Sequence, residues 1–74
     1  MQLGTRWTSG AEIPAAVPPA LHEQIRAIDE VVAADPRPRW TLTFLEGRPI
    51  AELDNGVIVE QTPSGEVTVS DDAA

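Results

Sequence analysis

The chain has 74 residues, 42% of them hydrophobic, with a formal net charge of −7 and no cysteine. This length allows one domain with a small core, and the missing cysteine excludes disulfides and thiolate metal sites. The acidic charge disfavours binding to phosphate backbones and anionic membrane surfaces, so we expect no nucleic-acid partner and no membrane.

Residues 1–18 are predicted to form an irregular N-terminal arm, because glycines or prolines at positions 4, 10, 14 and 18 interrupt it. The arm nevertheless contains Trp7 and aliphatic residues such as Val17, which a free tail would not need. We therefore expect part of the arm to lie on the body of the protein, and the pattern allows a short strand between Leu3 and Thr8.

Residues 19–34 are predicted to form one helix. Its apolar residues recur at spacings of four, three and four, which places them on one face. These residues are Leu21, Ile25, Ile28 and Val32. Pro19 suits the first helical turn, and Asp35 followed by Pro36 is expected to end the helix.

Three acids, Asp29, Glu30 and Asp35, lie near the predicted C-terminal end of this helix, where the helix dipole favours cations. We expect Arg37 and Arg39, which follow directly, to fold back onto these acids. The alternative is that the acids form a patch for a basic partner.

Residues 39–70 are predicted to form a four-stranded antiparallel meander. We assign its hairpin loops to residues 46–47, 54–56 and 63–65, each of which ends in glycine. This register places nine residues on one face: Trp40, Leu42, Phe44, Ala51, Leu53, Val57, Val59, Val67 and Val69. With the helix packed on that face, the prediction is a two-layer α+β domain over residues 19–70, followed by a frayed acidic tail over 71–74.

The opposite face of this sheet carries the residues that we predict to form an interface. Leu45, Ile50 and Ile58 fall close together there, and three adjacent aliphatic side chains on a bare sheet mark an interaction surface. Thr43 and Arg48 lie beside them, and Arg48 is expected either to pair with Glu46 or to bind an anion. Trp7 is expected to cap this face or to anchor a partner, because tryptophan is frequent at interface hot spots.

No catalytic, metal or cofactor site is predicted. Glu52 and Glu60 also fall on the opposite face, where both are expected to be exposed, whereas an acid–base pair needs one desolvated carboxylate. His22 stands alone in the first helical turn, and no calcium-loop or phosphate-loop motif is present. We therefore do not expect an enzyme.

The leading hypothesis is a cytoplasmic, non-enzymatic interaction module that forms a homodimer, sheet to sheet or by exchange of the arm, or that binds another protein. The cytoplasmic location is expected because the first residues lack a basic stretch followed by an apolar one. One alternative is a small-ligand-binding or enzymatic domain with a pocket between arm, helix and sheet that involves Trp7, His22 and Arg48. Another is an acidic mimic of nucleic acid that inhibits a basic protein.

Overall fold

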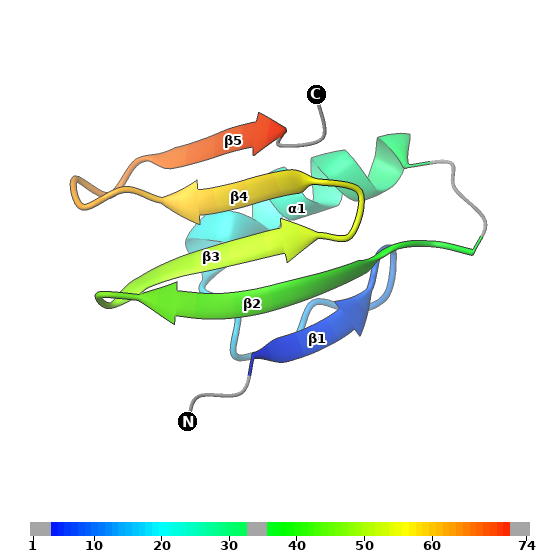
Figure 1. Ribbon diagram of the computed structural model, residues 1–74, viewed down its shortest axis with the longest axis horizontal. Coiled ribbons are helices and arrows are strands. Elements are labelled where there is room, and N and C mark those ends of the chain that lie inside the picture. Colours follow the sequence, from blue (N-terminus) through cyan, green and yellow to red (C-terminus); the bar gives the residue numbers. More distant parts are fainter. Residues whose placement is uncertain (1–3, 33–35, 72–74) are drawn as a thin grey trace.

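The computed structural model describes residues 4–32 and 36–71. One helix packs on an open five-stranded antiparallel sheet, in the order β1-β2-β3-β4-β5 (Figure 1). The elements are β1 (Thr5–Thr8), α1 (Pro19–Val31), β2 (Arg39–Leu45), β3 (Arg48–Leu53), β4 (Val57–Gln61) and β5 (Val67–Asp71). The predicted two-layer α+β fold is confirmed, and β1 is the short strand that the arm was expected to supply.

The predicted register of the meander is also confirmed. Leu42 lies opposite Ala51, Ala51 opposite Val59, and Val59 opposite Val69. The first loop has two residues, Glu46 and Gly47, and both adopt positive φ angles, of 53° and 80°. This is the conformation of a type I′ turn, whose twist matches that of the two strands that it joins.

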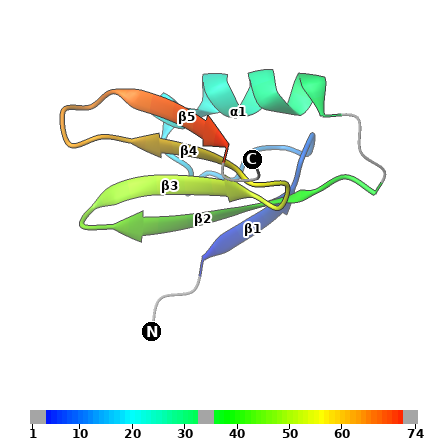
Figure 2. The same cartoon turned by 45° about the horizontal axis from the view of Figure 1, so that its top comes forward.

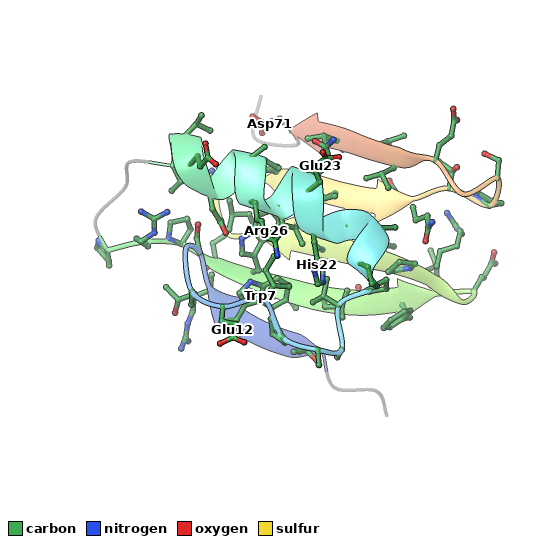
Figure 3. The ribbon with its side chains drawn as sticks, turned by 180° about the vertical axis from the view of Figure 1, so that it is seen from behind. Trp7, Glu12, His22, Glu23, Arg26 and Asp71 are labelled. Atoms are coloured by element: carbon green, nitrogen blue, oxygen red, sulfur yellow. The ribbon has the colours of Figure 1, made fainter. Side chains whose placement is uncertain are left out.

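The core lies between the sheet and a second layer, which Figure 2 shows as α1 on one side of the sheet. The helix lies over β4 and β5. The segment between β1 and α1 runs over the same side of the sheet (Figure 3). The buried apolar residues are Trp7, Val17, Leu21, Ile25, Trp40, Leu42, Ala51, Leu53 and Val59.

Two residues that were predicted for the core, Phe44 and Val69, are 43% and 48% exposed. Phe44 lies next to the first hairpin, at the end of β2 away from Trp40, the β2 residue that hydrogen-bonds to the helix. Val69 lies on β5, an edge strand that no described strand flanks on its outer side. The helix is about 20 Å long and therefore covers only part of the apolar face.

The helix ends at Val31, earlier than the predicted residue 34. Val32 is already extended, with a ψ angle of 122°. The guanidinium of Arg37 donates a 2.9 Å hydrogen bond from Nη2 to the carbonyl oxygen of Asp29, which has no acceptor role left within the shortened helix. The predicted stop signal at Asp35 lies outside the described residues.

Arg37 folds back onto the helix end as expected, but among the described residues it bonds to backbone oxygens and the Ser9 hydroxyl and not to a carboxylate. Its Nε donates to the carbonyl oxygen of Ser9 at 2.7 Å. The carboxylate of Asp29 instead accepts hydrogen bonds from Ser9 Oγ and from Trp40 Nε1. The side chain of Arg39 makes no ion pair with Asp29 or Glu30, so the prediction is wrong for these two acids, while Asp35 lies outside the described residues.

Candidate functional site

The side of the sheet opposite α1 has no second layer in the described part of the chain. Figure 1 looks onto this side, with the helix behind the strands. We call it the open face. Because side chains alternate along a strand, the register shows which residues point to the open face. They include Thr41, Thr43, Leu45, Arg48, Ile50, Glu52, Ile58, Glu60 and Thr68.

The register brings the predicted aliphatic residues of the open face together. Ile50 lies opposite Thr43 on one side and Glu60 on the other, and Ile58 lies opposite Glu52. Ile50 and Ile58 are therefore diagonal neighbours on adjacent strands, within reach of each other. Leu45 is 54% exposed, and the two isoleucines are half-buried. We call Leu45, Ile50 and Ile58 the open-face patch.

Arg48 stands at one end of the open-face patch, directly opposite Leu45. Its guanidinium lies 4.0 Å from Glu46 Oε1, as predicted, and 3.9 Å from Glu60 Oε2. These distances are long for ion pairs, and Glu46 is 80% exposed, so each pair contributes at most about 1 kcal/mol. These weak pairs leave the guanidinium of Arg48 available to a second protein at the rim of the patch.

The expectation that Trp7 caps the open face is wrong. Trp7 lies directly opposite Trp40 in the β1–β2 pairing, so both side chains point to the helix side of the sheet. The two rings stack with centroids 6.1 Å apart, and Trp7 is only 7% exposed. Trp7 is therefore a core residue, and the described part of the arm leaves the open-face patch uncovered.

The acidic side chains of the described residues do not form a metal-binding cluster. Among residues 4–32 and 36–71, no three histidine or acidic side chains lie close enough to hold a metal ion. The Nε2 of His22 donates a 2.9 Å hydrogen bond to the carbonyl oxygen of Val17. His22 therefore links the first turn of the helix to the segment that precedes it.

An open depression of about 640 Å³ lies between the arm and α1. Glu12, His22 and Arg26 line it, and Figure 3 shows these side chains on the arm side of the helix. The predicted alternative pocket would combine His22 with Trp7 and Arg48. The structure does not bring these three together, because Trp7 is buried and Arg48 lies on the open face.

A second depression, of about 460 Å³, lies between the C-terminal half of α1 and the β4–β5 hairpin. We call it the α1–β5 groove. Its apolar lining residues are Ile28, Val31, Val32, Val57 and Val69. This groove was not predicted from the sequence, because Val69 was expected in the core and Val31, which is 78% exposed, lies outside the predicted helix stripe.

Comparison with known proteins gives no significant match to any family model, to any characterised protein or to any solved structure. No described helix has the length and apolar character needed to span a membrane.

Proposed function

We propose that this protein is a small, non-enzymatic interaction module that self-associates through its open face. The observation that carries the proposal is the open-face patch, three adjacent aliphatic side chains on a sheet surface that no described segment covers. Exposed apolar clusters of this kind mark interaction surfaces in small proteins. A domain of this size also has a limited core, and oligomerisation is a common source of additional stability.

The surroundings of the patch suit a symmetric interface. A two-fold dimer brings the same surface of both copies together, so that surface must complement itself. Arg48 lies at one end of the patch and Glu52 at the other, which allows opposite charges to meet across a two-fold axis. A standard interface of about 800 Å² per partner would cover about one sixth of the 4839 Å² surface of the chain.

The test is sedimentation equilibrium of the wild type and of Ile58→Asp over a range of concentrations. We expect the wild type to form a dimer and the variant to be monomeric with an unchanged circular dichroism spectrum, because the new carboxylate would be desolvated in the interface. Ala27→Asp, which adds the same charge at an exposed helical position on the other layer, serves as the control. A variant at Ile58 that associates as strongly as the wild type would refute the proposal.

A second candidate function is small-ligand binding in the depression between the arm and α1. Its volume of about 640 Å³ lies within the usual range for ligand sites, and its lining offers both a cation, Arg26, and a carboxylate, Glu12. Screening of metabolites by amide NMR tests it: shifts centred on residues 10–13 and 22–30 would support binding there.

The cytoplasmic location stays a prediction.

A further inference from the structure

We infer that the outer edge of β5, which no described strand pairs with, binds an extended basic segment of a partner protein together with the α1–β5 groove, so that the segment adds to the sheet as a sixth strand. This surface is separate from the open-face patch. The inference therefore stands or falls independently of the proposed self-association.

The hydrogen-bonding pattern of the last hairpin determines which backbone groups of β5 point outward. Thr62 donates its N–H to the carbonyl oxygen of Glu66 at 2.7 Å, so these two residues form a hydrogen-bonded pair. Such pairs alternate along an antiparallel ladder, so Thr68 and Ser70 also bond to β4. Val67 and Val69 consequently direct their N–H and C=O groups toward the free edge.

The same two valines place their side chains on the helix side of the sheet, where Val69 lines the α1–β5 groove. A strand added to β5 would set every second side chain on that side, next to Val69 and over the apolar groove. The remaining side chains of the added strand would lie on the open-face side, next to Thr68 and Ser70. The groove thus favours a segment in which apolar residues alternate with others.

The negative charge of the C-terminal part of the chain favours basic residues at the non-apolar positions of the added strand. No arginine or lysine follows Arg48 in the sequence, whereas six acidic residues do. On the open-face side of the hairpin lie Glu60 and Glu66, and Glu23 projects from the side of α1 nearest β5 (Figure 3). Basic residues at the alternate positions of an added strand lie on the open-face side, where they would meet Glu60 and Glu66, and Glu23 adds negative charge on the helix side.

Charge also decides against a second copy of this chain at the edge. Natural edge strands are commonly protected from pairing with another chain by lysine, proline or a bulge. β5 has no bulge in its register and contains neither lysine nor proline. Pairing of two β5 strands would bring acidic ends of two acidic chains together, which is unfavourable. The same charges attract a basic strand, and addition of a strand to an exposed sheet edge is an established mode of peptide recognition.

The probe for the test is a short synthetic peptide in which arginine and valine alternate, titrated into the isotope-labelled protein and followed by amide NMR. We expect shifts concentrated at residues 67–71 and 31–32. A peptide of equal charge with a central proline, which cannot donate in the ladder, should bind about tenfold more weakly or not at all. A peptide with glutamate in place of arginine should not bind.

Val69→Pro removes an outward N–H and leaves the β4–β5 hydrogen bonds in place, so it should abolish binding of the alternating peptide. If this variant does not fold, Glu66→Arg should weaken binding by about tenfold through like-charge repulsion. Equal binding of the proline peptide, or shifts centred on the open-face patch or elsewhere, would overturn the inference.

Discussion

The indole Nε1 of Trp40 donates a 2.9 Å hydrogen bond to Oδ1 of Asp29, and this bond joins strand β2 to the last turn of α1. The hydroxyl of Ser9 donates to the same oxygen. Trp40 and Ser9 are 0% and 1% exposed, so neither donor has access to water. One carboxylate therefore connects the arm, the helix and the sheet.

Replacement of Asp29 by alanine should reduce the free energy of unfolding by about 2–3 kcal/mol, because it leaves two buried donors without an acceptor. Asp29→Asn should cost less, since its amide oxygen can still accept both bonds. Urea denaturation measures both effects, with Glu30→Ala, an exposed neighbour, as the control. Equal losses for the alanine and asparagine variants would show that the hydrogen bonds contribute little.

The two stacked tryptophans should respond differently to replacement by phenylalanine. Trp40 uses its N–H to bind Asp29, whereas the buried Nε1 of Trp7 has no hydrogen-bond partner among the described residues. Both changes remove the same volume, so the difference between them isolates the N–H group. We expect Trp40→Phe to be more destabilising than Trp7→Phe by about 1–2 kcal/mol in urea denaturation. The reverse order would contradict the assigned hydrogen bond.

Glu46 offers a stabilising substitution. It adopts a φ angle of 53°, in the left-handed region that glutamate disfavours, at the first position of the two-residue loop. Asparagine is preferred there before glycine, so Glu46→Asn should raise the free energy of unfolding by about 0.5–1 kcal/mol. The loss of the weak pair with Arg48 subtracts little. Thermal and urea unfolding test this, and Ser64→Asn in the third hairpin loop is a control.

The register of β2 to β5 could be predicted because two local signals agree. The loops at Glu46-Gly47, Asp54–Gly56 and Pro63–Gly65 fix the pairing, and the alternation of apolar residues then places one coherent face inward. A shift by one residue would expose that whole face. The open-face patch followed directly, because Leu45, Ile50 and Ile58 occupy the alternate positions.

Features that depend on long-range packing could not be predicted. The pairing of β1 with β2 joins segments far apart in the sequence, and nothing local specifies that Trp7 faces inward. The exposure of Phe44 and Val69 depends on where the helix lies over the sheet. At the end of the helix, Arg37 makes hydrogen bonds to both the arm and the last helical turn, which local sequence does not specify.

Ionic strength should affect the two proposed interactions in opposite directions. Each copy carries a net charge of −7, and two copies repel each other on approach. At about 0.01 M salt the Debye length is roughly 30 Å, comparable to the 33 Å long axis of the protein, and it falls to about 8 Å at 0.15 M. Association through the apolar open-face patch should therefore strengthen as salt is added.

Binding of the arginine–valine peptide to β5 depends on attraction between opposite charges, so the same increase in salt should weaken it. Sedimentation equilibrium and NMR titration at the two ionic strengths measure both trends on one preparation. Ile58→Asp should remove the first trend and leave the second, and Glu66→Arg should reduce the second with little effect on the first. If both interactions weaken with salt, self-association is itself electrostatic, and the apolar patch does not drive it.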